Sequence, residues 1–301
     1  KEKKSEITIY HYGYNLIDEE MEKKCIRTSA LLEKQLQDDP TNPFAFQNYV
    51  RVLKVQKKHQ EVIVQSEKAL NVAKKRMTDY IRQMILYDYT CSLIETGDPA
   101  KAEKIARETL NDFPKNLDMC YSLGHSLMKQ KRYGEAKEVY ERFLNIQKKA
   151  QEKPEHSGLI IDTYTLADRV WAIIADCDYE LGQNKEGAEA AQRAIELNPE
   201  VAAYKISAAR NLAELNRLDE ASELLGRMER ENNPDENVYV KYGVLCKRYP
   251  GLGSAEEVLK KGVSLFPQST EVLNLYASTS LDSDVDVAQK AWQRVHEINP
   301  G

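Results

Sequence analysis

The stretch LDMCYSLGHSLMKQKRYGEAKEVYERFLN, residues 117–145, carries the pattern that decides the fold. Its apolar residues recur three or four positions apart in two runs: Leu123, Leu127, Ala136, Tyr140 and Phe143. A charged segment, residues 129–134, separates the two runs. This spacing predicts two amphipathic helices joined by a short turn. Gly124 and Ala136 are small enough to let the two helices approach each other closely.

The same helix pair recurs along the chain in degenerate form. An alignment on the small residue that opens the second helix, and on the proline that follows it, gives seven hairpins: Pro43–Lys75, Asp79–Pro114, Lys115–Ala150, Ile160–Pro199, Glu200–Asn233, Pro234–Pro267 and Gln268–Pro300. The aligned small position is held in turn by Val62, Ala102, Ala136, Gly187, Ala221, Ala255 and Ala288. One such hairpin cannot bury its apolar stripe alone, so we expect neighbouring hairpins to stack into an all-α solenoid.

The combination of Leu–Gly, Ala, an aromatic residue and a trailing Pro, repeated about every 34 residues, resembles the tetratricopeptide repeat, or TPR. This resemblance implies a right-handed TPR-type α-solenoid of about seven helical hairpins. It also implies that the first helix of each hairpin lines an inner groove that binds a protein or a peptide.

Three segments of the chain are expected to differ from one another. Residues 1–17 include ITIYHYGY, residues 7–14, whose β-branched and aromatic residues predict a short extended arm. Residues 18–38 show helical periodicity and predict one extra, leading helix. Residues 39–301 form the superhelix, with a break near residues 151–158, where Pro154 and Gly158 interrupt the helical pattern.

The inward positions of the first helices provide the candidate partner-binding groove. They carry aromatic, Arg and Asp residues: Asn48, Arg51, Tyr87, Asp88, Tyr121, His125, Arg169, Asp176, Tyr179, Arg210 and Lys241. Tyrosine offers a large contact area with few torsions to immobilise, and a neutral His125 could bond a peptide carbonyl or a carboxylate. The alternative is that His125 is an ordinary polar residue on a solvated face and that the tyrosines pack between helices.

Some proteins with these repeats bind acidic C-terminal peptides through Lys and Asn residues on three successive first helices. Two of the comparable positions in this chain are acidic, Asp88 and Asp118, so the sequence does not predict such a clamp.

Composition and motifs exclude several other classes of function. The 301 residues carry a net charge of -5, which argues against a nucleic-acid surface. Phosphate-binding loops, HExxH, GxSxG and zinc-like Cys/His spacings are absent, so no catalytic residue and no cofactor are predicted within this chain. The five separated cysteines indicate reduced thiols and a cytoplasmic protein. No apolar run approaches the roughly 20 residues of a membrane span.

The arm supports a second resemblance. Residues 7–14, followed by a helix and the turn at residues 39–43, resemble the junction in bacterial family 2 glycosyltransferases that carry TPR extensions. That resemblance implies that His11 lies near a catalytic divalent metal, with a nucleotide sugar as donor, if a catalytic domain precedes Lys1. The alternative for His11 is an aromatic arm that caps the first repeat.

The sequence therefore predicts a protein–protein interaction module, the acceptor-binding or scaffolding part of a cytoplasmic bacterial glycosyltransferase. The alternative is a free-standing assembly or regulatory scaffold with no enzymatic parent. Both ends of the chain look cut, and exposed repeat ends would allow self-association.

Overall fold

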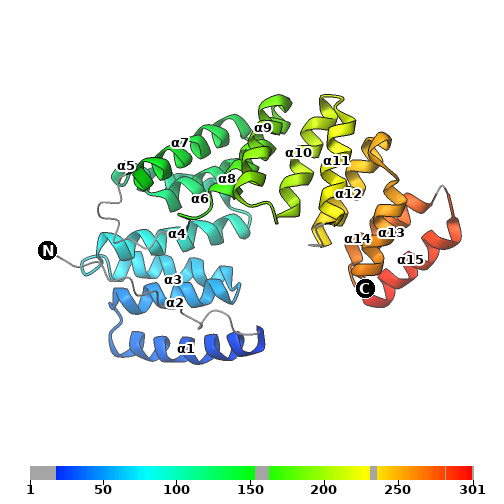
Figure 1. The fold of residues 1–301 in the computed structure, drawn as a ribbon. Coiled ribbons are helices and arrows are strands. Elements are labelled where there is room, and N and C mark those ends of the chain that lie inside the picture. The colour runs from blue at the N-terminus through cyan, green and yellow to red at the C-terminus, as the bar shows by residue number, and fades with distance from the viewer. Residues whose placement is uncertain (1–17, 153–162, 231–235, 282, 300–301) are drawn as a thin grey trace, which may run out of the picture. The chain divides into compact units, whose positions relative to one another are not determined.

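The computed structural model describes residues 18–152, 163–230, 236–281 and 283–299. Within these ranges the chain forms fifteen α-helices, one short 3-10 helix and no strand (Figure 1). The prediction of an all-helical solenoid is confirmed for this part of the chain. The predicted extended arm, residues 7–14, lies outside the described residues.

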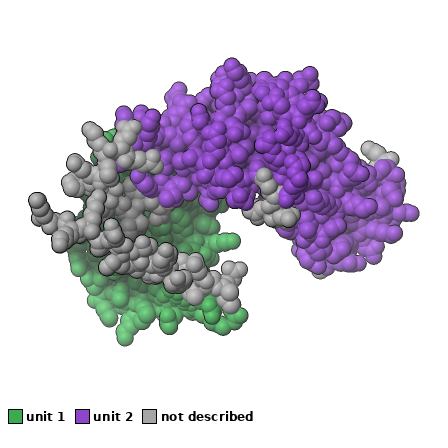
Figure 2. All heavy atoms as spheres, viewed as in Figure 1, with its two compact units in different colours: residues 1–131, 155–161 green, residues 132–154, 162–301 purple. Residues whose placement is uncertain are grey.

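The described residues divide into two compact units, one up to Lys131 and one from Arg132 onward (Figure 2). The described helices of unit 1 are α1 (Asp18–Asp38), α2 (Pro43–Val55), α3 (His59–Val72), α4 (Asp79–Glu95), α5 (Pro99–Asp112) and α6 (Leu117–Lys129). Those of unit 2 are α7 (Tyr133–Glu152), α8 (Ala167–Glu180), α9 (Asn184–Leu197), α10 (Ala202–Glu214), α11 (Leu218–Arg230), α12 (Glu236–Arg248), α13 (Ala255–Leu265), α14 (Thr270–Ser280) and α15 (Val285–Ile298), with the 3-10 helix Pro250–Leu252 between α12 and α13.

Short polar side chains define where many of these helices begin. The side chain of Asn42 accepts a hydrogen bond from the backbone N–H of Ala45 at 3.1 Å, and Pro43 occupies the first turn of α2. The side chains of Asp98 and Asn116 cap α5 and α6 in the same way. Each cap satisfies a backbone donor that the helix itself leaves unpaired.

Several turns inside the hairpins contain a residue in the left-handed conformation. In unit 1 this residue is Lys57, with φ of 58°, or Gly97, with φ of 88°. In unit 2 it is Gly182, with φ of 72°, or Asn216, with φ of 59°. Such a residue lets the next N–H groups bond back to the last carbonyls of the first helix. The chain can then reverse within a few residues.

Neighbouring hairpins stack through their first helices. In unit 1, α2 packs against α4 and α4 against α6; in unit 2, the order is α8, α10, α12 and α14. The aligned small residues are buried at Val62, Ala102, Ala136, Gly187, Ala221 and Ala288, and half-buried at Ala255. Helices approach closely at Gly187 in α9, where an added Cβ would lie 2.3 Å from Oδ1 of Asn211 in α10, and at Gly243 in α12, where it would lie 2.5 Å from Cδ2 of Leu259 in α13. Small residues therefore set the distance between helices, as the sequence pattern predicts.

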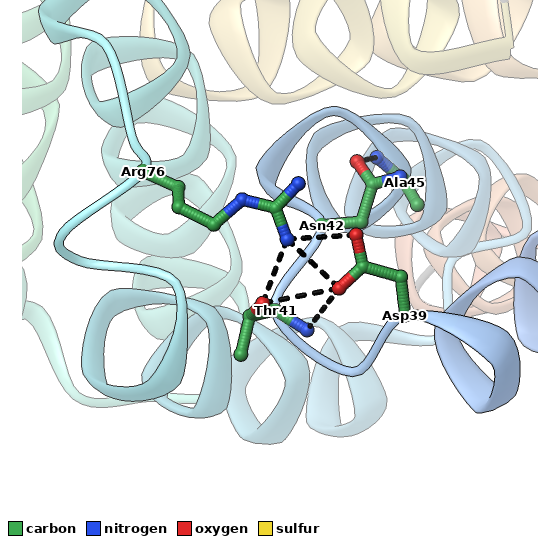
Figure 3. Close-up of polar contacts among 5 residues, drawn as sticks. All are labelled: Asp39, Thr41, Asn42, Ala45 and Arg76. Carbon is green, nitrogen blue, oxygen red and sulfur yellow. Dashed lines mark hydrogen bonds and ion pairs between the residues drawn. The ribbon is translucent and has the colours of Figure 1, made fainter.

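An ion pair ties two interhelical connections of unit 1 together (Figure 3). Arg76, between α3 and α4, donates to both carboxylate oxygens of Asp39, at 2.8 and 2.7 Å, and to the hydroxyl of Thr41 at 2.8 Å. The hydrogen bond from Arg76 lowers the pKa of Asp39, so the carboxylate stays ionised at neutral pH. The contact fixes the turn that leads into α2 against the turn that leads into α4.

Candidate functional site

In unit 1 the first helices bring three charged side chains together. Asp88 on α4 is 1% exposed, and its Oδ1 lies 2.7 Å from Nζ of Lys54 on α2. Its Oδ2 lies 2.9 Å from Nε of Arg51, also on α2. Burial lowers the pKa of Lys54, but interactions with neighbouring Cys91 and Asp88 raise it by more, so the pKa lies above its usual value. Lys54 therefore stays charged. Together with Arg51 it surrounds the buried carboxylate of Asp88, and these three residues form the ion cluster of unit 1.

This ion cluster changes the role of two predicted groove residues. Asp88 holds Lys54 and Arg51 in place, and its carboxylate is not at the surface. Tyr87 is also buried, and the ammonium of Lys54 lies 4.4 Å from the centre of its ring. Lys54, which the sequence analysis does not single out, is thus central to the cluster. Asn48 is half-buried, and its amide donates to the carbonyl of Phe44 on its own helix at 2.9 Å.

The predicted pair on α6 lies together. The rings of Tyr121 and His125 are stacked, with centroids 6.4 Å apart and planes 4° from parallel, and both side chains are half-buried. Burial, and then the charge of Lys129, lower the pKa of His125, although Glu95 opposes the shift. The imidazole is therefore neutral at neutral pH, with one nitrogen able to donate and the other able to accept.

In unit 2 the predicted residues form a second polar array. The guanidinium of Arg210 on α10 lies 3.9 Å from the ring centre of Tyr179 on α8. The same guanidinium donates to Oδ1 of Asp176 at 2.6 Å. Arginine stacked on an aromatic ring and paired with a carboxylate has few conformations left. These three residues therefore form a fixed platform across two first helices.

Three further residues, which the list of groove candidates does not contain, complete this array. Arg248 on α12 donates to the hydroxyl of Tyr179 at 2.6 Å and to Oε1 of Glu214 at 2.5 Å. Ser207 on α10 donates to Asp176 at 2.9 Å. The predicted residues Arg169 and Lys241 are exposed on α8 and α12.

A sequence signal could have found the omitted partners. The ion pairs Lys54–Asp88, Asp176–Arg210 and Glu214–Arg248 each join residues that are 34 positions apart. This separation equals the repeat length, so opposite charges at equivalent positions of adjacent first helices face each other. A search for acid–base pairs at that spacing would have added Lys54 and Arg248.

Neither a metal site nor a membrane span is found in the part of the chain that the structure describes. No group of three His, Cys, Asp or Glu side chains there could hold a metal ion, and His11 lies outside that part. None of the described helices combines the length and apolar character needed to cross a bilayer.

Comparisons with known proteins agree with the geometry of the repeats. Two tetratricopeptide repeat models match residues 93–156 and 175–237. A tetratricopeptide repeat protein from Parabacteroides merdae has a TM-score of 0.58 and 15% identity over 92% of this chain and 98% of that one. Yeast Tom70 has a TM-score of 0.58 and 15% identity over 93% of this chain and 56% of the Tom70 chain. For pilF of Pseudomonas aeruginosa the TM-score is 0.55, with 15% identity over 80% of this chain and 97% of that one.

These likenesses establish the fold. The chain contains tetratricopeptide repeats and has the fold of a TPR-type α-solenoid. The comparison with curated protein sequences gives no match. Proteins built from such repeats present extended surfaces that bind other proteins.

Proposed function

We propose that this chain is a protein-binding scaffold module whose partner lies along the first helices. One observation carries the proposal: aromatic and polar side chains of the first helices contact one another, within one helix or between successive ones, and stay partly exposed. Tyr121 and His125 do so in unit 1, and Tyr179 with Arg210 does so in unit 2. Such rigid, partly exposed aromatic and Arg groups are the side chains that contribute most to protein interfaces.

Site-specific photo-crosslinking in the source cells tests this function. A benzoylphenylalanine is introduced on a first helix, at Asn48 or Arg169, and at matched exposed positions of second helices, Glu108 on α5 and Lys260 on α13. We expect a crosslinked protein band from the first-helix positions only. Equal crosslinking from both sets of positions, or none from the first helices, would contradict the proposal.

Tyr121 and His125 provide a second test of the same surface. Replacing both with Ala should weaken the crosslink from Asn48, because the stacked pair offers a neutral donor and an aromatic face on a first helix of the same unit. Since both side chains are only half-buried, the free energy of unfolding should fall by no more than about 1 kcal/mol. Unchanged crosslinking by a stable double variant would remove this pair from the binding surface.

A finer proposal concerns the parent protein. We propose that the module is the acceptor-binding part of a cytoplasmic bacterial glycosyltransferase, which would use a nucleotide sugar and a divalent metal near His11. The support is the resemblance of residues 7–14 and of the turn at residues 39–43. The reading frame upstream of Lys1 tests it: a sugar-nucleotide domain with a D-x-D motif is expected. A start codon just before Lys1 would favour the free-standing scaffold.

Self-association is a further proposal for the same module. Large apolar side chains are exposed on the first and last helices, at Leu31 on α1 and at Val285 and Trp292 on α15. Sedimentation over a series of concentrations should show a mass that rises with concentration. A constant monomer mass would contradict it.

A further inference from the structure

The exposed face of α12 has a specific chemical character. Lys241, Val244 and Arg248 follow one another at intervals of three and four residues and so share one side of the helix. Val244 is 50% exposed and the side chain of Arg248 is 58% exposed. An apolar side chain therefore lies at the surface between two cations.

Contacts with preceding helices hold one of these cations in position. The guanidinium of Arg248 donates to Glu214 at 2.5 Å and to the hydroxyl of Tyr179 at 2.6 Å. Its central carbon also lies 5.4 Å from the ring centre of Tyr249. A guanidinium carries five N–H donors, so these two hydrogen bonds leave donors that can bind a further carboxylate. Because the side chain is already ordered, such a carboxylate would bind with little loss of side-chain entropy.

The charges around α12 are unequal. The two carboxylates of the array, Asp176 and Glu214, are each paired with an arginine of the next first helix. Lys241 has no ion-pair partner among the described residues, and Arg169 and Lys247 are also exposed. In the part of the chain that the structure describes, the surface thus offers positive charge, on Lys241, that no ion pair neutralises. Charge complementarity favours an acidic partner.

We propose that unit 2 binds a segment of its protein partner in which an apolar side chain, flanked by acidic residues, sits on Val244. The flanking carboxylates bind Arg248 and Lys241, and Tyr179 and Arg210 extend the surface toward α8. This inference rests on the proposed protein-binding function and adds the chemistry of the partner. It does not require a free C-terminus in that partner, because every cation involved can bind a side-chain carboxylate.

Fluorescence anisotropy with the whole chain and labelled synthetic peptides tests this inference. The probe contains Glu-Glu-Leu-Glu-Glu, and the matched peptides contain Gln-Gln-Leu-Gln-Gln, Glu-Glu-Ser-Glu-Glu or Lys-Lys-Leu-Lys-Lys. We expect the acidic Leu peptide to bind at least about tenfold more tightly than each of the other three. Added salt should reduce its advantage over the amide and lysine peptides, which differ from it in charge. Equal affinity for the acidic and amide peptides, or no binding of the acidic Leu peptide, would overturn the proposal.

Variants of exposed residues locate the peptide without threatening the fold. Lys241→Glu should weaken the acidic peptide by about tenfold or more and improve the binding of the lysine peptide. Val244→Ser should erase the preference for Leu over Ser in the acidic peptide. Lys260→Glu on the second helix α13 makes the same charge change at an exposed site and should leave both affinities unchanged. An equal effect of Lys241→Glu and Lys260→Glu would mean that only net charge matters, which would also overturn the proposal.

The result of the peptide-binding experiment can be distinguished from the result of the crosslinking experiment that tests the proposed function. If the crosslinks from first-helix positions appear but the acidic peptide does not bind, the chain binds a protein of different chemistry. If neither appears, the protein-binding function itself fails.

Discussion

The buried carboxylate of Asp88 makes the strongest prediction about stability. In Asp88→Asn the side chain keeps its shape but loses the charge that holds Lys54 and Arg51. Removing one partner of a fully buried ion pair costs about 3–5 kcal/mol. Here the side chains of Arg51 and Lys54 are 29% and 24% exposed, so solvent offsets part of that cost. We therefore expect a loss of about 2–4 kcal/mol in the free energy of unfolding.

Urea unfolding followed by circular dichroism measures this loss. Because a repeat array can unfold in parts, the first transition is fitted separately if two transitions appear. The matched control is Asp112→Asn on α5, whose carboxylate is 56% exposed and lies 3.5 Å from Arg82. An exposed pair of this kind should contribute less than about 1 kcal/mol. If Asp88→Asn and Asp112→Asn cost the same small amount, the reasoning about the buried cluster is wrong.

A combined variant separates the loss of charge from the loss of packing. Replacing Asp88 with Leu, and both Arg51 and Lys54 with Met, removes all three charges and keeps similar volumes. Apolar replacements of buried ion clusters are often neutral or stabilising, so we expect most of the stability to return. A triple variant less stable than Asp88→Asn would indicate that the shape of these side chains, and not their charge, dominates.

Three further predictions concern the backbone and the surface ion pair. Gly243→Ala should destabilise unit 2 by about 1–3 kcal/mol in urea unfolding, because the added Cβ has no room beside Leu259. Gly134→Ala, in open space near the start of α7, should instead stabilise the protein by up to about 1 kcal/mol. The opposite order of stabilities would refute the close approach at Gly243. Asn216→Gly should raise the thermal midpoint, since glycine adopts the positive φ without strain; a lower midpoint would show that the Asn side chain matters more. Arg76→Ala should lower the urea midpoint at neutral pH. The difference from wild type should shrink as pH falls below 3.8, the usual pKa of the Asp39 carboxyl, because Arg76 stabilises only the ionised carboxylate and so lowers its pKa in the folded state. A difference that does not change with pH would contradict the ion pair.

The repeated spacing of small and apolar residues is enough to predict the helices. The first expected hairpin, Pro43–Lys75, contains α2 and α3, and the last, Gln268–Pro300, contains α14 and α15. This works because each helix depends on local periodicity, local caps and the nearest neighbours in the sequence. Long-range pairing, which sequence patterns do not specify, contributes little to a solenoid.

The state of each side chain on the first helices is harder to predict from the sequence. Asp88 and Arg169 both occupy predicted groove positions, yet the first is 1% exposed and the second is exposed. The difference comes from the adjacent first helix, which provides Lys54 and Arg51 to cover Asp88. Helical periodicity gives the direction of a side chain, but its accessibility depends on the length and charge of residues one repeat away.

The fifth hairpin also has a consequence for rearranging the array. Arg210 pairs with Asp176 of the preceding hairpin, and Glu214 pairs with Arg248 of the following one. The hairpin thus offers a cation toward one neighbour and an anion toward the other. A tandem duplicate of residues 200–233 would not match itself, because at the 34-residue spacing Glu214 of one copy would face Glu214 of the next, and Arg210 would face Arg210. Lengthening the protein at this point by duplication would therefore oppose like charges. Deletion of the hairpin would instead bring Glu180 to the 34-residue spacing from Arg248, which keeps opposite signs together there, and would leave Asp176 opposite Val244.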